Sequence, residues 1–276
     1  MSNFNKINNI LGWTIFSIAS FVYLSTIEQT VSFWDCGEYI STAYKLEVGH
    51  PPGAPLFQLL GRMFSLFAEP ATSQVAVSIN ILSALCSSLT ILFLYWTITG
   101  FAQKIKLDYS KNTKQILIFF SGIIGSLTYT FTDSFWFSAV EGEVYAMSSF
   151  FTAVTFWCIM KWEKESDKAS SSRWLILISY LIGLSIGVHL LSLLTIPAMG
   201  MIYYNKKYNY SKLGAIKAFF ISLIILVFIQ GVIIPGAVSL IYSFELFFTN
   251  NLGLPFNCGT IIYFLSIIAL ITIGLI

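Results

Sequence analysis

Residues 34–38 read Trp-Asp-Cys-Gly-Glu and residues 50–53 read His-Pro-Pro-Gly, and both motifs lie in one polar segment between long apolar runs. This segment, residues 28–73, combines acids, a histidine and turn-forming residues. The apolar runs on either side are long enough to cross a bilayer, for which about 20 residues are needed. We therefore expect the chain to form a membrane scaffold that holds the segment at one face of the membrane.

The composition is that of a membrane protein. Of the 276 residues, 56% are hydrophobic and only 10% are charged, whereas a soluble domain carries about 25% charged residues. The aromatic share of 17% suits a protein with aromatic belts at both membrane surfaces. The sequence thus predicts an all-α polytopic membrane protein, and a net charge of +2 is no indication of nucleic-acid binding.

Most basic residues lie at the start of the chain and in three later stretches. These hold 13 of the 15 Lys and Arg: Lys6, Lys104, Lys106, Lys111, Lys114, Lys161, Lys164, Lys168, Arg173, Lys206, Lys207, Lys212 and Lys217. By the positive-inside rule these places are cytoplasmic. We therefore expect a cytoplasmic N-terminus, and most of the acids at the periplasmic face of the cytoplasmic (inner) membrane. This asymmetry predicts a site that opens at the outer surface.

The apolar runs predict about eight transmembrane helices in a single domain that covers residues 1–276. We expect spans at 8–27, 74–100, 115–132, 144–160, 174–204, 216–241 and 259–276, of which 174–204 must either cross twice in little space or dip into the membrane and return. A short outer link, 133–143, should join the third and fourth spans, and Pro235-Gly236 could kink a later one. Because the last span stops at the final residue, we expect the chain to be the N-terminal part of a longer protein.

The first outer segment has the features of two helices. Ser32 and Asp35 form a capping-box pattern and Gly49 precedes two prolines, which together predict a helix over 33–48. Residues 54–69 carry one apolar stripe. Because this stretch is too short to span a bilayer, we expect a helix that lies in the membrane interface.

Asp35 and Glu38 are the first candidates for catalysis. They are three residues apart and share a helix face, where like charges repel. Asp35 could simply cap its helix and Glu38 could be a solvated charge. In an aromatic setting beside the membrane, however, desolvation would raise one pKa and prepare that carboxylate to act as a general base.

Six further residues are candidates for substrate binding, and most of them also have a structural interpretation: His50, Arg62, Glu141, Glu143, Tyr145 and His189. His50 could belong only to a rigid turn, and Arg62 could extend to lipid headgroups rather than bind a phosphate. Glu141 and Glu143 precede a span, where the helix dipole favours acids. His189 could be a packing residue, although an ionisable group among apolar helices is a functional candidate.

Several runs of the sequence resemble a family long filed as domain of unknown function 2723. The resemblance extends from about residue 8 to 240, and the matching runs are 34–38, 43–46, 48–56, 139–145 and 187–191. The family is similar to membrane glycosyltransferases of the GT-C fold, which include protein O-mannosyltransferases. The resemblance therefore implies a GT-C-like bundle with a helical first outer loop.

The resemblance also implies an activity. Such enzymes transfer a sugar, here mannose or another hexose, from a polyprenyl phosphate to Ser or Thr hydroxyls of an acceptor protein outside the membrane. Their essential acid in the first outer loop maps to Asp35, with Glu38 beside it, and an assisting acid maps to Glu141 or Glu143. His50, Arg62 or His189 would neutralise the leaving phosphate. Which acid of the first loop is the base is left open.

No cofactor is expected from the sequence. Some GT-C enzymes hold a divalent cation with paired acids, but no residue pattern here requires a metal, and we expect metal-free chemistry. Other functions stay open: a lipid or polysaccharide acceptor, a transporter of lipid-linked sugars, or a structural membrane subunit. A transporter would place ionisable groups near the middle of the membrane, where this sequence has few.

Overall fold

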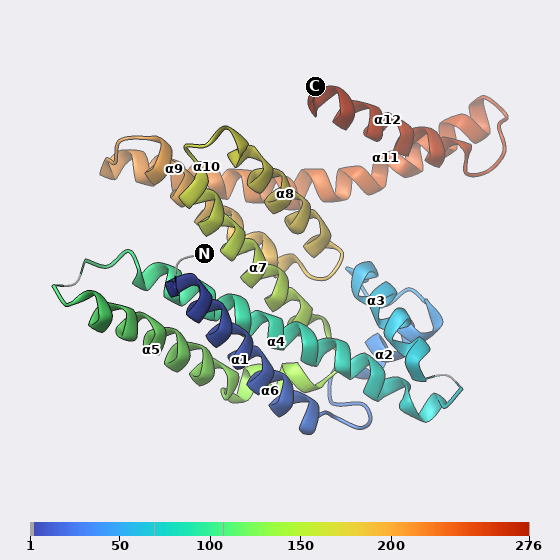
Figure 1. The fold of residues 1–276 in the computed structure, drawn as a ribbon. Helices are drawn as coiled ribbons and strands as arrows, with labels where there is room; N and C mark the ends of the chain where they lie inside the picture. Colours follow the sequence, from blue (N-terminus) through green and yellow to red (C-terminus); the bar gives the residue numbers. More distant parts are fainter. Residues whose placement is uncertain (1–2, 69, 107, 276) are drawn as a thin grey trace. The chain divides into compact units, whose positions relative to one another are not determined.

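The computed structural model describes residues 3–68, 70–106 and 108–275, and all regular structure within them is helical (Figure 1). The chain divides into two compact units, Met1–Asn209 and Tyr210–Ile276. The first unit holds all of the candidate site residues.

The first unit is built around α4 (Val75–Ala102), a helix of 28 residues. It packs against α1 (Asn3–Ser25), α5 (Lys111–Thr130) and α7 (Val144–Glu165), and Figure 1 shows it crossing the unit between α5 and α7. Helix α4 can be central because it is apolar around its circumference and its small hydroxyl residues let neighbouring helices approach closely. Those that are buried include Ser78, Ser83, Ser87, Ser88 and Thr90.

The first outer segment folds into α2 (Cys36–Lys45) and α3 (Pro55–Ser65), so a helical loop is confirmed but its boundaries differ from the expected ones. The predicted capping box is wrong. Trp34 has a φ of 61°, in the left-handed region, which a helix cannot continue through. The helix therefore begins only after Asp35, which occupies the N-cap position without a side-chain cap.

Two short 3-10 helices, η1 (Leu66–Ala68) and η2 (Thr72–Gln74), lead from α3 towards α4. The predicted apolar stripe of α3 is exposed in part: Leu59, Met63 and Phe67 are all on the surface. Exposed apolar residues at this spacing are what a helix facing lipid requires. Its position in the interface stays a prediction.

The expected short link between the third and fourth spans is present at residues 133–143, and most of it is the helix α6 (Asp133–Val140). Helix α6 follows α5 at a bend of 66°. Trp136 donates its indole N–H to Thr26 Oγ1 at 2.9 Å, and the N–H of Glu28 bonds to the carbonyl of Val140 at 3.2 Å. These contacts bring the start of the first outer segment beside residues 141–143.

The stretch expected to cross twice is a pair of short helices. After η3 (Ala169–Ser171), α8 (Ser172–Ile186) has 15 residues, and α9 (Thr195–Lys207) has 13. Between them lies the 3-10 helix η4 (Leu190–Leu194). Each helix is shorter than a full crossing requires. The turn that precedes η4 is tied to the outer segment, since the N–H of Leu56 bonds to the carbonyl of Gly187 at 2.7 Å.

The second unit is a helical hairpin. Helix α10 (Lys212–Phe228), the π-helical turn η5 (Ile229–Ile233), α11 (Ile234–Leu246) and a second π-helical turn, η6 (Phe247–Asn251), form one run of 40 residues. Helix α12 (Cys258–Leu275) packs back against α11. Pro235 has no backbone N–H and cannot donate a helical hydrogen bond. The run continues past it because the π-helical turn η5, directly before α11, accommodates this missing donor.

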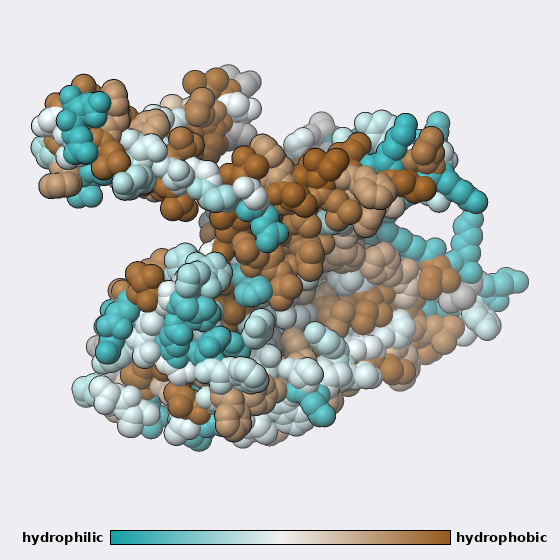
Figure 2. Space-filling view, turned by 180° about the vertical axis from the view of Figure 1, so that it is seen from behind, coloured by the Kyte–Doolittle hydropathy of each residue, from teal (hydrophilic) through white to brown (hydrophobic). Residues whose placement is uncertain are grey.

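Four helical runs of the described chain are long and apolar enough to cross a membrane: Asn3–Ser25, Thr72–Ala102, Val144–Glu165 and Lys212–Asn251. The bent pair of α5 and α6 makes a fifth if it counts as one span. The chain is thus a multi-pass membrane protein, but a count of about eight spans is not confirmed, because α8 and α9 are short. Figure 2 shows hydrophilic side chains gathered over the α2–α3 segment and hydrophobic ones over much of the neighbouring helical surface.

Candidate active site

Asp35, Glu38 and His50 form a compact cluster at the outer segment. The Glu38 carboxylate accepts the backbone N–H of His50 at 2.6 Å, and its second oxygen lies 3.1 Å from His50 Nδ1. On the other side of the ring, His50 Nε2 is 3.8 Å from Asp35 Oδ2. The hydrogen bonds from His50 lower the pKa of Glu38. The structure therefore brings together both acids that the sequence selects and the histidine that follows them.

The turn that carries His50 depends on a glycine. A Cβ on Gly49 would lie 3.2 Å from Glu38 Oε1 and 3.1 Å from Gln58 Nε2. Such contacts are too short for most side chains, so the absence of a Cβ lets the backbone of the turn approach the carboxylate. Gly49 thus has a role in positioning His50, although it lies beyond the end of α2.

Glu141 and Glu143 lie between α6 and α7, and both are buried. Burial raises the pKa of Glu141. Burial, together with the charges of Glu141 and Asp35, raises the pKa of Glu143 to about 7. A carboxyl group in this state exchanges its proton near neutral pH, as acid–base catalysts do.

The two pairs of acids come from separate segments, and a polar anchor holds these segments together. Asn80 on α4 donates to the carbonyl of Glu28 at 2.7 Å and to that of Thr30 at 3.2 Å. On the other side, a Cβ on Gly142 would lie 2.8 Å from Asn80 Oδ1 and 3.0 Å from Ile40 of α2. The link between the glutamates therefore packs directly against the anchor and against α2.

Tyr39 belongs to the cluster although the sequence does not single it out as a site residue. Burial and the negative charges of Glu143, Asp35 and Glu38 raise its pKa to about 12. Its ring lies 5.6 Å from that of His50, between centroids. Its spacing could have identified it from the sequence: Tyr39 follows Asp35 by four residues, so the two side chains lie one helical turn apart on the same face. A protonated phenol is a hydrogen-bond donor for an oxygen of a substrate.

Tyr145 and His189 form a neighbouring pair, with ring centroids 5.5 Å apart. Burial lowers the pKa of His189, which favours the neutral imidazole. The N–H of Leu191 donates to His189 Nδ1 at 3.2 Å. Because Nδ1 accepts this bond, the proton of the neutral ring is on Nε2, where it can be donated to another group.

Arg62 lies elsewhere on the outer segment. Its guanidinium is 5.2 Å above the ring of Tyr44 and donates to Ser65 Oγ at 3.2 Å. These described contacts are with its own segment and not with the acids. The structure thus brings together seven of the eight residues that the sequence selects, and the described contacts of Arg62 are with Tyr44 and Ser65 rather than with these seven.

An apolar cavity of about 610 Å³ adjoins Tyr145. Its lining comes from α4, α5, α7 and η4, and includes Leu94, Tyr129, Phe156 and Leu194. Its walls are mostly aliphatic, aromatic or small hydroxyl residues. The cavity can therefore accept a hydrocarbon chain next to the Tyr145–His189 pair.

A divalent cation is chemically possible at the first cluster. One donor atom each from Asp35, Glu38 and His50 lies within 4.8 Å of the others. Two carboxylates and one imidazole form a ligand set that several divalent metals accept. A cation that used His50 Nδ1 and Glu38 Oε2 would have to displace the hydrogen bond between these two atoms.

Comparison with known proteins places the chain in a family. The family described as "Protein O-mannosyl-transferase TMEM260 N-terminal domain" matches residues 35–212. A protein of Dictyostelium discoideum named "Protein O-mannosyl-transferase tmem260" is 29% identical over 140 residues, which are 51% of this chain and 15% of that protein. A mouse protein named "Protein O-mannosyl-transferase TMEM260" is 24% identical over 173 residues, 62% of this chain and 22% of that protein.

No solved structure matches the chain significantly. The chain spans less than a quarter of the length of these curated relatives. The matched residues 35–212 nevertheless include all of the residues of the acid cluster and the Tyr145–His189 pair. Because this match covers more than half of the sequence, the chain belongs to the family of the protein O-mannosyl-transferase TMEM260 N-terminal domain.

Proposed function

We propose that the chain forms the active-site part of a membrane glycosyltransferase. The enzyme moves mannose or another hexose from a polyprenyl-phosphate donor to Ser or Thr hydroxyls of an acceptor protein. The reaction takes place on the periplasmic face of the inner membrane, opposite the basic stretches. Membership in the family and the names of the relatives support the transfer of a sugar to protein.

One observation carries the proposal: acids from two separate segments converge beside His50, and one of them has a pKa near neutrality. Asp35 and Glu38 come from the first outer segment, and Glu143 comes from the start of α7. The charge of Asp35 is among the causes that raise the pKa of Glu143. A purely structural segment gains nothing from bringing like charges together, whereas a site for proton transfer does.

The chemistry is a displacement at the anomeric carbon. Asp35 takes the proton from the acceptor hydroxyl, and the hydroxyl oxygen forms a bond to that carbon. The bond from the carbon to the phosphate oxygen breaks, and its electron pair leaves with the polyprenyl phosphate. A single in-line step inverts the anomeric configuration. The Asp35 side chain is 54% exposed and can meet a bulky acceptor, which the buried Glu143 cannot.

The Tyr145–His189 pair and the adjoining cavity suit the donor. The Nε2–H of a neutral His189 can donate to the leaving phosphate, whose negative charge grows as the bond breaks. His50 is the second candidate for this role. The apolar cavity beside Tyr145 can hold the first isoprene units of the donor. Arg62 has no role in this arrangement.

The test compares wild type with Asp35→Asn in the full-length protein, produced at matched levels in cells that lack the gene. Sugar attached to periplasmic proteins is measured by intact-mass spectrometry. Glu47→Gln is the control, because Glu47 is an exposed acid of the same outer segment. We expect glycosylation to disappear in Asp35→Asn and to persist in the control. Full glycosylation by Asp35→Asn would show that this cluster is not the catalytic site.

The acceptor is a separate question. If protein glycosylation is absent in the wild type but a lipid or polysaccharide gains sugar in an Asp35-dependent manner, the transferase chemistry holds and the acceptor is different. A transporter of lipid-linked sugars would leave both kinds of acceptor unmodified. It would instead change the side of the membrane on which the donor accumulates.

A further inference from the structure

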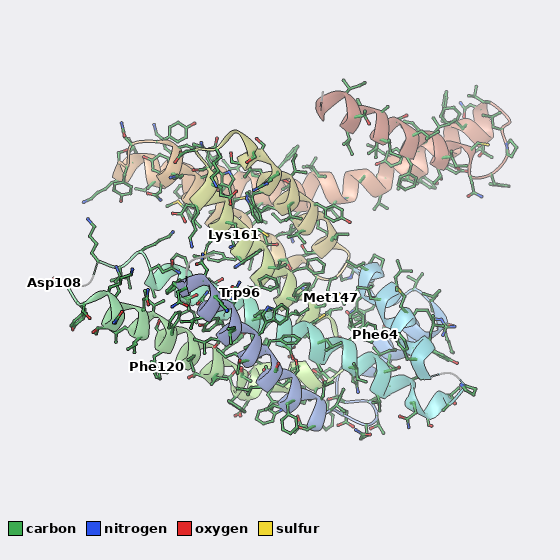
Figure 3. The ribbon with its side chains drawn as sticks, viewed as in Figure 1. Phe64, Trp96, Asp108, Phe120, Met147 and Lys161 are labelled. Carbon is green, nitrogen blue, oxygen red and sulfur yellow. The ribbon has the colours of Figure 1, made fainter. Side chains whose placement is uncertain are left out.

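A polar pocket lies at the end of the first unit opposite the acid cluster. Its lining comes from the first turns of α1 and the last turns of α4 and α7. Along α7, Lys161 lies 17 residues beyond Val144, or about 26 Å at 1.5 Å per residue. In Figure 3, Trp96 and Lys161 lie towards this end, whereas Phe64 marks the α2–α3 segment. The pocket is therefore separate from the proposed active site.

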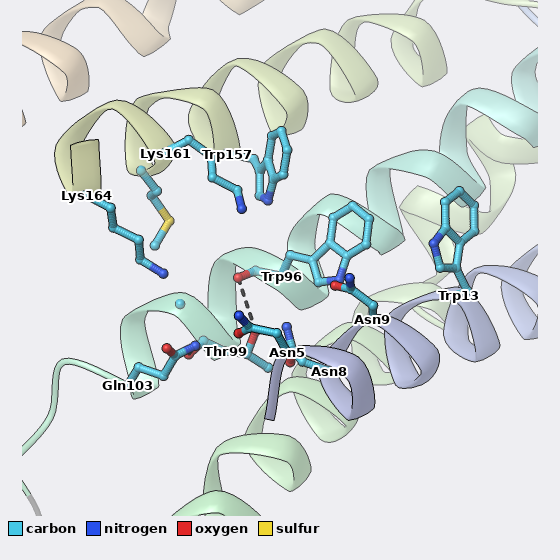
Figure 4. A pocket seen from close by; sticks show the side chains of 12 residues that line it. Asn5, Asn8, Asn9, Trp13, Trp96, Thr99, Gln103, Trp157, Lys161 and Lys164 are labelled. Atoms are coloured by element: carbon cyan, nitrogen blue, oxygen red, sulfur yellow. Dashed lines mark hydrogen bonds between the residues drawn. The ribbon is translucent and has the colours of Figure 1, made fainter. Parts of the chain in front are cut away.

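The pocket has about 430 Å³ of space, within the range of roughly 300–1,000 Å³ typical of small-ligand sites. Figure 4 shows asparagine side chains of α1 on one wall and two lysines of α7 on the facing wall. Indole rings from α1, α4 and α7 complete the lining. Polar amides, cations and indoles are thus gathered in one cavity at the end of a membrane-spanning bundle.

Both lysines are available to an anion. Lys161 Nζ lies 4.8 Å from the centre of the Trp157 ring, and neither Lys161 nor Lys164 forms an ion pair with any carboxylate of the described chain. Two other lysines of the basic stretches, in contrast, do form ion pairs. Lys104 pairs with Glu163, and Lys206 pairs with Asp167 at 3.1 Å. Two lysines that form no ion pair with the described carboxylates and line one pocket attract an anionic group.

Two buried polar atoms of the lining also lack partners. Trp96 Nε1 and Asn8 Oδ1 are shielded from solvent, and neither has a hydrogen-bond partner among the described residues. Figure 4 shows the Trp96 indole beside Asn9. An unpaired donor and an unpaired acceptor are both costly to bury. Because both atoms are shielded, a hydroxyl-bearing ligand would satisfy them only by turning the Trp96 and Asn8 side chains towards the pocket.

We propose that this pocket binds the headgroup of an anionic phospholipid that carries a free hydroxyl, of the phosphatidylglycerol type. The phosphodiester would lie between Lys161 and Lys164, and the hydroxyl-bearing part would lie among the α1 amides and Trp96. Basic pockets between membrane helices on the positively charged side are suited to such headgroups. Tryptophan is also the residue that favours the depth of the headgroups. The proposal does not depend on the proposed transferase activity.

The test is binding of defined lipids to the purified full-length protein, measured by native mass spectrometry. The probes are phosphatidylglycerol, phosphatidylcholine of the same chain length, and water-soluble glycerol phosphate. The variants are Lys161→Gln/Lys164→Gln and, separately, Trp96→Phe, which removes the indole N–H but keeps an aromatic ring. The matched control is Lys111→Gln/Lys114→Gln, which removes two lysines of α5 that do not line the pocket.

We expect wild type to bind phosphatidylglycerol about tenfold or more tightly than phosphatidylcholine, and the Lys161/Lys164 variant to lose this preference. Trp96→Phe should weaken phosphatidylglycerol binding a few-fold, and the control should bind as wild type does. Equal binding of the two lipids, or equal losses in the control and the Lys161/Lys164 variant, would overturn the proposal. Competition by glycerol phosphate at the same concentration as the lipid would assign the pocket to a soluble phosphate ester instead. If the double variant does not fold, the Trp96→Phe variant becomes the test. Binding of phosphatidylglycerol to Trp96→Phe as tightly as to wild type would then reject the proposal.

Discussion

The carboxylate of Glu38 receives two hydrogen bonds from one residue, His50: its backbone N–H donates at 2.6 Å and its ring Nδ1 lies at 3.1 Å. Asp35 faces the other ring nitrogen at 3.8 Å. The two acids of the first outer segment are therefore not equivalent. Glu38 orients the histidine, while Asp35 keeps an exposed carboxylate.

This difference predicts different activities for two variants. Hydrogen bonds from His50 lower the pKa of Glu38, and a carboxylate that holds protons weakly is a poor general base. We expect Asp35→Asn to reduce glycosylation by about 100-fold or more, the usual contribution of a general base. Glu38→Gln should reduce it less, because the amide oxygen can still accept a bond from His50. Equal losses in the two variants, measured by intact mass at matched expression, would contradict these roles.

Chelation should not remove the activity. Glu38 Oε2 already bonds to His50 Nδ1, and Glu38 Oε1 accepts the backbone N–H of His50, so a cation that used these oxygens would have to compete with both bonds. We expect the purified full-length enzyme to keep its transfer rate after treatment with EDTA, followed as product formed from a labelled donor. A loss that Mg²⁺ or Mn²⁺ restores would instead show that Asp35, Glu38 and His50 hold a metal ion.

Glu143 should make stability depend on pH. Its pKa is about 7 in the folded chain, against an ordinary value of 4.5, so between these values the folded chain binds more protons than the unfolded chain. Stability must then fall as the pH rises from about 4.5 through 7. At about 1.4 kcal/mol per pKa unit, the charged Glu143 lowers the free energy of unfolding at pH 8 by an amount on the order of 3 kcal/mol.

The variant Glu143→Gln tests this cost because it removes the charge and keeps the shape. We expect it to unfold at a higher temperature than wild type at pH 8 and to differ much less at pH 5, measured by intrinsic fluorescence in detergent. Glu47→Gln serves as an exposed control. If Glu143→Gln raises the unfolding temperature equally at both pH values, the charge of Glu143 is not the cause of the increase.

Two glycines should respond in opposite ways to the same substitution. A Cβ on Gly142 would lie 2.8 Å from Asn80 Oδ1 and 3.0 Å from Ile40, so Gly142→Ala should destabilise the protein by about 1–3 kcal/mol. It should also lower activity, because it displaces the link between Glu141 and Glu143.

Gly183, within α8, has no atom within 4 Å of its Cβ position. Gly183→Ala should therefore be neutral or stabilising. Thermal unfolding of both variants is the measurement, and a destabilised Gly183→Ala would contradict the packing argument.

Glu245 should be a structural acid. Its carboxylate accepts the backbone N–H of Asn257 at 2.6 Å and that of Thr260 at 2.9 Å, which are unpaired donors at the start of α12. We expect Glu245→Ala to increase amide hydrogen exchange at residues 257–261 and to leave the catalytic step intact. Hydrogen-exchange mass spectrometry checks the first expectation. Unchanged exchange at these residues would show that the carboxylate does not hold the helix start.

The sequence by itself determined the class of protein and the residues worth testing. Long apolar runs with few charges are typical of membrane helices, and charged residues are costly to bury in lipid, so composition and charge placement indicate that class. Local patterns also predicted a helical first outer loop. They did not predict that Trp34 would adopt a left-handed conformation and delay the start of α2, because that conformation depends on the surroundings of the turn.

Only the tertiary structure decided what the selected residues do. The contacts of α6 with Thr26 and Glu28, and the anchor at Asn80, bring Glu143 close to Asp35 although 107 residues separate them in the sequence. The pKa of Glu143 follows from burial and neighbouring charge, and neither can be read from spacing along the chain. The same holds for the pocket at Lys161, whose walls come from three helices that are distant in sequence. Both sites arise because packing places polar groups in surroundings that their own segments do not specify.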